Sequence, residues 1–560
     1  MTETIAPTAE IARTSTAARI GWAILILATL YVCYFSHLGA IGFVGPDEPR
    51  YAWIARDMVE TGDWVTPRLY GKPWFEKPVL YYWGAAICFK LFGVSETAAR
   101  LPSAISALLA TLALAWLALR LYGAETARWL LLLLPTTVGM IGFSHAAATD
   151  MPFSGMLTIA MVCAAVALGL TRNENTPILP RTPWLALILF GFFLGLAVLA
   201  KGPAAIILSG GAIFFWALFT KRWRDAFRLF HPAALASFCL TALPWYILCA
   251  RRNPDFFRIF IIEHNFKRYL TPEFQHIQPF WYYGPILLIG LAPWFICLVW
   301  HALPGARKDI ADLRSPVEIF VVSWAIFPLL FFTLSKSKLP GYILPSILPL
   351  GLLLATAVTQ SLHNKSLLAR FAVTGSALLY LASVLWIWLD LYFYPSTKGV
   401  HSILVIGPVF ILFFTFFAGI GGLASMVLSL ANRPRAGQIF AFIAFLFMVD
   451  VAYDSSIKLN LELSPRTVVS DISAAGANRT YSYRMQRGWL YGFNFYLHRE
   501  VPEWTPTTPG SALVVTSRRN FQELKRSAEV IQVVSDFSDE ANIVEVRSLA
   551  DRPSNSGQPH

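Results

Sequence analysis

Stretches of about 20 consecutive apolar residues recur along most of this chain, and they limit its possible folds more than any other feature. A stretch of that length crosses the hydrocarbon core of a bilayer as one α-helix. The apolar residues are continuous and do not alternate with polar ones, which excludes a transmembrane β-barrel. Only 14% of the 560 residues are charged, whereas soluble domains have about 25%. The sequence therefore predicts an all-α polytopic membrane protein.

The basic residues between the apolar runs predict the topology. The run at 78–93 is short and contains Lys90. If this run does not cross the membrane, every cytoplasmic loop carries a basic cluster, as the positive-inside rule requires. We therefore expect an in-plane or re-entrant helix at 78–93, about 13 transmembrane helices in total and an external C-terminus. The expected spans after the first lie near 99–122, 126–145, 150–171, 184–200, 203–220, 229–250, 280–302, 317–335, 339–361, 368–390, 403–431 and 437–454.

The segment "GPDEPRYAWIARDM" that follows the first span predicts an amphipathic helix. Pro49 suits a first helical position and Asp47 or Glu48 suits the cap. Gly62 ends the pattern. Apolar residues recur with a helical period, so we expect this helix to lie on the membrane and residues 44–98 to form a large external loop of interfacial helices. The apolar positions are Tyr51, Ile54, Ala55, Met58 and Val59.

A change of composition near residue 456 predicts two domains. Residues 1–455 form the transmembrane domain. Residues 456–560 contain segments such as "SALVVTS" and "NIVEVRSL", which are typical of strands around a helix. We therefore expect a small C-terminal α/β soluble domain of about 100 residues.

With this topology, polar residues from six separate segments fall on the outer face of the membrane. Charges at membrane depth cost about 2.5–3.5 kcal/mol each, so they tend to mark function. Simpler structural roles exist for these residues. Asp47 and Asp150 could cap helices, and the side chain of Lys201 could extend from a helix end to the membrane interface. Glu76 could form a surface ion pair with Lys77. The outer-face residues are Asp47, Glu48, Glu76, Lys77, Asp150, Lys201, Glu263, His264, Lys267, Arg268, Lys336 and Lys338.

Carboxylates and lysines around a cavity at the outer leaflet suit the transfer of a sugar from a lipid phosphate. Cations or a metal would stabilise the departing phosphate. A carboxylate would take a proton from a hydroxyl acceptor or position the sugar, whereas a phosphate acceptor needs no base. The six cysteines all lie in apolar segments, and the sequence has no HExxH motif, so no pattern by itself indicates a metal site.

Three motifs carry a resemblance to a known family. "GPDEPRYAWIARDM", "GDWVTPRLYGKPWFEKPVLYYW" and "SKLPGYILPSILPL" resemble elements of the C-type-fold (GT-C) membrane glycosyltransferases. Within that fold, the chain resembles the superfamily of aminoarabinose transferases and protein O-mannosyltransferases. The first two motifs look like the first periplasmic loop of the bacterial transferases that modify lipid A.

The resemblance implies an activity, a location and a set of site residues. It implies inverting transfer of 4-amino-4-deoxy-L-arabinose from a polyprenyl phosphate to lipid A phosphate. The protein would be a multi-pass bacterial inner-membrane protein, with its active site and C-terminal domain facing the periplasm, and would bind no nucleic acid. Asp47 and Asp150 would be catalytic, and Glu76 with His264 would hold a divalent metal such as zinc. The residues expected around the donor phosphate are Arg50, Lys77, Lys201, Arg268, Lys338 and Tyr342.

Two other functions stay open on the sequence alone. One is the transfer of mannose or another hexose to Ser or Thr of secreted proteins, in which Asp47 would act as a base. The other is transport of a lipid-linked sugar without chemistry, which predicts polar residues at mid-membrane in broken helices.

Overall fold

The computed structural model describes residues 16–171, 183–271, 277–302, 315–363 and 463–549, except 471, 473 and 537–540, together with scattered residues between 375 and 446. In this part of the chain, seven helices are long and apolar enough to cross a membrane. Their presence confirms a multi-pass membrane protein. They are α1 (Thr16–Tyr34), α4 (Glu96–Leu121), α7 (Asp150–Ala167), α8 (Trp184–Lys201), α11 (Pro232–Arg252), α15 (Pro316–Leu334) and the continuous η4–α16 segment (Pro340–Ile343 and Leu344–His363).

Several shorter helices complete this bundle. The expected span at 126–145 is a bent pair, α5 (Ala124–Leu133) and α6 (Val138–Ser144), whose axes differ by 62°. The expected span at 280–302 consists of α13 (Tyr283–Gly290) and α14 (Phe295–Ala302). Most residues of the expected spans at 368–390, 403–431 and 437–454 lie outside the described part of the chain, as does the domain boundary at 455/456. The other short elements are α9 (Ala204–Thr220), α10 (Trp223–Phe227), η1 (Arg228–Phe230), η2 (Arg258–Lys267) and α12 (Arg268–Leu270).

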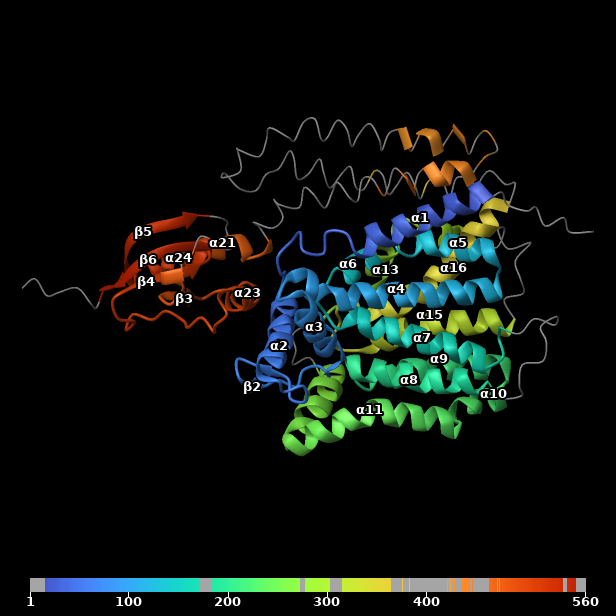
Figure 1. Cartoon of the computed structure of the whole chain (residues 1–560), viewed down its shortest axis with the longest axis horizontal. Helices are drawn as coiled ribbons and strands as arrows, with labels where there is room; N and C mark the ends of the chain where they lie inside the picture. The colour runs from blue at the N-terminus through green and yellow to red at the C-terminus, as the bar shows by residue number, and fades with distance from the viewer. Residues whose placement is uncertain are drawn as a thin grey trace, which may run out of the picture.

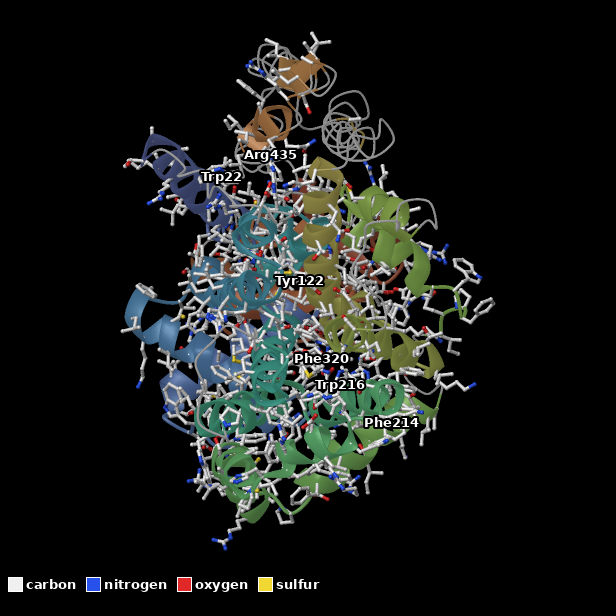
Figure 2. All side chains as sticks on the ribbon, turned by 90° about the vertical axis from the view of Figure 1, so that its right-hand side faces the viewer. Trp22, Tyr122, Phe214, Trp216, Phe320 and Arg435 are labelled. Atoms are coloured by element: carbon white, nitrogen blue, oxygen red, sulfur yellow. The ribbon has the colours of Figure 1, made fainter. Side chains whose placement is uncertain are left out.

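Large aromatic side chains fill the bundle. Figure 2 looks onto the bundle from the right-hand side of Figure 1, and Tyr122, Trp216 and Phe320 lie among the helices in that view. Trp216 is fully buried, packs edge-on against Phe320, and donates a hydrogen bond from its indole nitrogen to the carbonyl oxygen of Pro316 at 2.8 Å. Phe214, two residues before Trp216 on α9, is half exposed at the periphery. This contrast is typical of a helix with one face toward protein and one toward lipid.

The expected interfacial helices are α2 (Asp47–Thr61) and α3 (Leu80–Phe92). Figure 1 shows α2 running across the left-hand end of the long helices. Gly62 ends α2 in a left-handed conformation (φ 73°) that costs glycine little. The apolar face of α2 is buried, as predicted, but against protein: Tyr51 packs on Tyr81 and Tyr82 of α3. The expectation that this face lies on the membrane is therefore wrong.

A two-residue turn shapes the loop between α2 and α3. Strands β1 (Arg68–Leu69) and β2 (Lys72–Pro73) pair antiparallel, joined by Tyr70 and Gly71. Both turn residues have positive φ angles, 52° and 76°, as a type I′ hairpin requires. The hairpin directs the chain back toward the bundle just before Glu76.

The C-terminal elements form a four-stranded sheet with short helices. The strand order is β3–β4–β6–β5, with β3 and β4 parallel and the other pairs antiparallel. In the register of β4 and β6, Val514 faces Val544, and both are fully buried. This sheet lies beyond α2 in Figure 1. The elements are α21 (Arg466–Ser470), α22 (Ala474–Ala477), β3 (Thr480–Tyr483), α23 (Arg487–Leu497), β4 (Ser511–Thr516), α24 (Arg518–Leu524), β5 (Ala528–Asp536) and β6 (Asn542–Ser548).

Candidate functional site

The acidic pair of the first loop divides into one buried and one accessible carboxylate. Glu48 is buried and accepts hydrogen bonds from the backbone nitrogens of Val44 (2.8 Å) and Ala147 (2.7 Å). It also accepts two from the guanidinium of Arg100, at 3.0 and 2.7 Å. Both oxygens of Glu48 are therefore fully engaged. The side chain of Asp47, by contrast, is 52% exposed, so Asp47 is the carboxylate of this pair that a ligand can reach.

Neither acidic residue caps α2, so that prediction is wrong. The helix begins at Asp47, after Pro46, and no side chain accepts a hydrogen bond at its N-cap. The carboxylate of Asp47 turns instead toward Arg50, one helical turn on, with which it forms an ion pair. Asp150 likewise begins α7 without a side-chain cap, and its carboxylate forms an ion pair with Lys201 instead.

Arg50 connects the first loop to the second motif. Its guanidinium pairs with Asp47 and also with Glu76, whose Oε2 lies 2.9 Å from Nη1. The rings of Tyr51 and Trp74 lie 5.2 and 5.3 Å from the guanidinium carbon. The side chain is only 5% exposed. Arg50 therefore holds two predicted site carboxylates in fixed relation to each other.

A second ion pair joins two transmembrane helices at the same end of the bundle. The Nζ of Lys201, the last residue of α8, lies 2.5 Å from Oδ1 of Asp150, the first residue of α7. The same Nζ lies 4.9 Å above the ring of Tyr342 in η4. Helix ends from three separate segments thus place a carboxylate, an ammonium group and a phenol together.

Glu76 and Lys77 lie between these two clusters. Nη1 of Arg268 lies 3.3 Å from Oε1 of Glu76, and Nζ of Lys77 lies 3.9 Å from it. Burial alone would raise the pKa of Glu76, but the positive charges of Lys77, Arg50, Arg268 and His264 lower it to about 2. Glu76 is therefore ionised at every physiological pH.

Burial and the neighbouring charge of Arg268 lower the pKa of Lys77 to about 8, against the opposite effect of Glu76. Lys77 also interacts electrostatically with Asp47 and Lys201. An anion placed next to Lys77 would favour its charged form. The environment of this lysine is thus suited to binding an anionic group.

A cavity of about 360 Å³ opens beside these residues. One part of its wall is charged or polar, and the other is apolar and formed by α9, α12 and α15. Such a wall suits a ligand with an anionic head and a hydrocarbon tail. The polar lining includes Glu76, Lys77, Lys201, His264, Asn265, Arg268 and Tyr342; the apolar lining includes Pro203, Ala204, Ile207, Leu270, Phe331 and Phe332.

Two predicted phosphate-binding residues do not line this cavity. Arg50 is buried behind it between Asp47 and Glu76. Lys338 is buried and donates hydrogen bonds to the carbonyl oxygens of Ser335 (2.8 Å) and Gln278 (3.2 Å). Both cations therefore hold the backbone or the carboxylates that surround the site. The four other predicted phosphate residues, Lys77, Lys201, Arg268 and Tyr342, all line the cavity.

Glu76 and His264 share the cavity wall, as a metal site would require. In the described part of the chain, no three His, Cys, Asp or Glu side chains gather closely enough to hold a metal ion. A zinc site is usually four-coordinate. These two residues fit a metal only as a partial ligand set, in which a ligand's oxygens or water complete the coordination.

Sequence reasoning missed the residues that hold the loop in place. Arg100 lies near the N-terminal end of α4, where arginine is ordinary, yet it binds Glu48 and donates to the carbonyl oxygens of Leu38 (2.7 Å), Ile41 (2.6 Å) and Gly42 (3.0 Å). The signal for its role was a charge next to a long apolar run.

The sequence is similar to proteins of known name over part of its length. Residues 13–260 match the family described as dolichyl-phosphate-mannose-protein mannosyltransferase. The chain is 35% identical over 345 residues to the undecaprenyl phosphate-α-4-amino-4-deoxy-L-arabinose arabinosyl transferase of Aeromonas salmonicida, and 35% identical over 344 residues to that of Edwardsiella ictaluri. Each alignment covers 61% of this chain and 60% of the relative.

The fold is similar over almost the whole chain to a solved structure. The crystal structure of ArnT from Cupriavidus metallidurans bound to undecaprenyl phosphate superposes with a TM-score of 0.73, at 22% identity, over 96% of this chain and 99% of that one. The apo structure of the same protein gives the same TM-score. The structural similarity confirms the C-type fold that the resemblance implied, and the chain spans about three fifths of the length of the aminoarabinose transferases that it matches in sequence.

Proposed function

We propose that the protein transfers 4-amino-4-deoxy-L-arabinose from undecaprenyl phosphate to a phosphate of lipid A, at the periplasmic face of the bacterial inner membrane. The observation that carries this proposal is the cavity with one cationic and one apolar wall. Lys77, Lys201 and Arg268 would hold the donor phosphate, while Ile207 and Phe332 would lie along the prenyl chain. The relatives named above and the ligand of ArnT support the choice of donor.

The proposed reaction is a single inverting displacement. A phosphate oxygen of the acceptor attacks the anomeric carbon, a new carbon–oxygen bond forms there, and the bond from that carbon to the undecaprenyl phosphate oxygen breaks. The released undecaprenyl phosphate carries away the electron pair. Lys77, Lys201 and Arg268 stabilise the charge that develops on it. No proton has to move, because the acceptor phosphate is already anionic.

The two predicted catalytic carboxylates have different tasks in this scheme. Asp47, half exposed and held by Arg50, would contact the sugar and orient it for attack. Asp150 would fix the ammonium group of Lys201 through their ion pair. Glu76 and His264 would hold a divalent metal, zinc by resemblance, next to the donor phosphate. When bound, such an ion would add positive charge at the leaving group.

The periplasmic location is part of the proposal. The described site residues lie at the end of the bundle where Figure 1 shows α2, and α10, which is flanked by the basic residues Lys221, Arg222 and Arg228, lies at the opposite end. Basic residues favour the cytoplasmic side. The end with α2 would then face the periplasm, where lipid A phosphates meet an outer-leaflet donor.

A reconstitution experiment tests the function. Purified protein in lipid nanodiscs receives undecaprenyl phosphate-aminoarabinose and lipid A, and mass spectrometry follows both lipids. We expect lipid A to gain one aminoarabinose for each donor consumed. A parallel reaction offers undecaprenyl phosphate-mannose and a Ser/Thr-rich peptide. Glycosylation of the peptide without modification of lipid A would contradict the proposal and favour the protein-glycosylating alternative.

A further inference from the structure

Helix α23 of the C-terminal region lies directly on the loop that presents Asp47. A Cβ atom on Gly488 would come within 3.1 Å of the carbonyl carbon of Gly45 and 3.4 Å of the backbone nitrogen of Pro46. Such distances to backbone atoms are tighter than ordinary van der Waals contact, so a side chain at this position would require the loop to shift. Glycine therefore allows α23 to approach the chain immediately before the predicted catalytic carboxylate.

One turn further along α23, Tyr491 reaches Arg50. The guanidinium carbon of Arg50 lies 5.8 Å from the centre of the Tyr491 ring. Together with Tyr51 and Trp74, this ring forms the aromatic surroundings of a guanidinium that is only 5% exposed. Cation–π attraction is strongest at such a desolvated site. Tyr491 thus contributes to holding the side chain that pairs with Asp47 and Glu76.

Other contacts attach α23 to the same external loop. The side-chain amide nitrogen of Asn494 donates a hydrogen bond of 2.7 Å to the hydroxyl of Tyr70, in the turn of the β1–β2 hairpin. The hydroxyl of Tyr496 accepts a hydrogen bond from the backbone nitrogen of Phe43 and donates one to Oε1 of Glu96, both at 2.8 Å. The loop is therefore held along its length, before Asp47 and beyond α2.

Arg466 of the neighbouring helix α21 extends this attachment. Its guanidinium donates to the carbonyl oxygens of Gly39 and Ala40, each at 2.8 Å. These are specific polar contacts to backbone atoms of the first loop. A domain joined only by a flexible linker would have no need of them.

The geometry points to α23 as a part of the active-site framework, with Tyr491 as a positioning residue that acts through Arg50 on Asp47 and Glu76. The C-terminal region would then contribute to catalysis indirectly, because it helps to set the orientation of the carboxylates that Arg50 holds. This inference rests on the proposed function for its kinetic test, and on the contacts alone for its structural test.

The kinetic test compares Tyr491→Leu, which removes the ring, with Tyr491→Phe, which keeps it. Full-length proteins in nanodiscs are assayed with undecaprenyl phosphate-aminoarabinose and lipid A. We expect kcat of Tyr491→Leu to fall about tenfold, which corresponds to about 1.4 kcal/mol less stabilisation of the transition state. KM for the donor should change less than about twofold. Tyr491→Phe should restore kcat.

Tyr483→Leu is the matched control, because Tyr483 is a half-buried tyrosine of the same region whose ring faces Arg484 at 5.6 Å. We expect this variant to keep the wild-type kcat. A Tyr491→Leu variant with wild-type kcat, or one that loses activity no more than Tyr483→Leu does, would overturn the inference. An inactive wild-type protein would instead count against the proposed function.

Hydrogen exchange supplies a test that needs no substrate. In Tyr491→Leu and in Gly488→Val, backbone amides of residues 43–50 should exchange faster than in the wild type, while those of α7 and α8 should not. Gly210→Val is the control for the second variant, because a Cβ at Gly210 meets open space. Unchanged exchange at 43–50 in Tyr491→Leu would show that the ring does not hold the loop.

Discussion

Arg100 holds Glu48 through two parallel hydrogen bonds, at 3.0 and 2.7 Å, and both side chains are buried. The same guanidinium fixes three backbone carbonyl oxygens of the chain before the loop. One arginine therefore determines how the chain leaves its first transmembrane helix and reaches Asp47.

Removing one member of this pair should destabilise the protein. Glu48→Gln leaves the charge of Arg100 buried without a counter-charge, and such a change costs about 3–5 kcal/mol. We expect a clear fall in the thermal unfolding temperature of the detergent-solubilised protein. Asp255→Asn, which removes an exposed pair with Arg258, is the control, and its effect should be within about 1 kcal/mol. Equal effects of the two changes would contradict the structural role of Glu48.

The pair between Lys201 and Asp150 should behave as one unit in catalysis. Lys201→Met removes a cation from the cavity wall, and we expect a loss of about 10²–10³ in kcat. Asp150→Asn should have a similar effect, because it frees Lys201 from its position. The double variant should lose little more than either single variant. Additive losses would show that the two residues act separately; Lys221→Met, at the end of α9 away from the cavity, is the control.

The effect of Asp47→Asn should depend on the acceptor. An acceptor phosphate needs no base, so we expect kcat with lipid A to fall less than about tenfold, since orientation of the sugar is only partly lost. A hydroxyl acceptor would require proton removal, and the loss would then be about 10²–10⁴-fold. Steady-state rates with lipid A distinguish these outcomes. Asp57→Asn, at a half-buried position of α2 outside the cavity, controls for charge removal from the same helix.

The apolar wall should determine selectivity for the length of the prenyl chain. Ile207→Trp narrows the cavity. Exclusion of two methylene groups of the donor would make the free energy of donor binding less favourable by about 1.6 kcal/mol. We expect KM for undecaprenyl donors to rise about 10–20-fold, while a donor with two isoprene units is unaffected. Ile206→Trp is a matched control, because the neighbouring Ile206 faces a different cavity. A uniform rise in KM for both donors would contradict the proposed path of the tail.

Zinc should bind appreciably only together with a polyprenyl phosphate. Glu76 and His264 supply two ligands, and phosphate oxygens are needed to complete the coordination. We expect zinc to raise the unfolding temperature of the protein when undecaprenyl phosphate is present, and to change it little when the lipid is absent. His264→Asn should abolish the combined effect. Stabilisation by zinc without the lipid would indicate a different ligand set.

The sequence predicted the helical class, and it singled out several residues that now line one cavity, because both depend on local signals. Apolar length indicated the spans, and the helical period indicated the buried face of α2 at Tyr51, Ile54 and Met58. Charges beside apolar runs indicated Lys77, Lys201 and Arg268, which the structure brings to one cavity.

The remaining features depend on contacts that no local pattern records. An amphipathic period does not distinguish a membrane from a protein surface, so the prediction that the apolar face of α2 lies on the membrane was wrong. Arg50 and Lys338 were expected at a phosphate, yet Glu76 and backbone carbonyl oxygens respectively engage them. Tyr491 reaches Arg50 from a distant part of the chain, and no motif of its own helix indicates this contact.

The close approach of Gly488 to Gly45 also has a consequence for the order of biosynthesis. The loop with Asp47 leaves the ribosome before most of the described transmembrane helices, whereas α23 leaves after all of them. A nascent chain can thus insert its helices while the carboxylate still lacks its support. The supported arrangement of Asp47 and Arg50 would therefore form only after α23 has been translated.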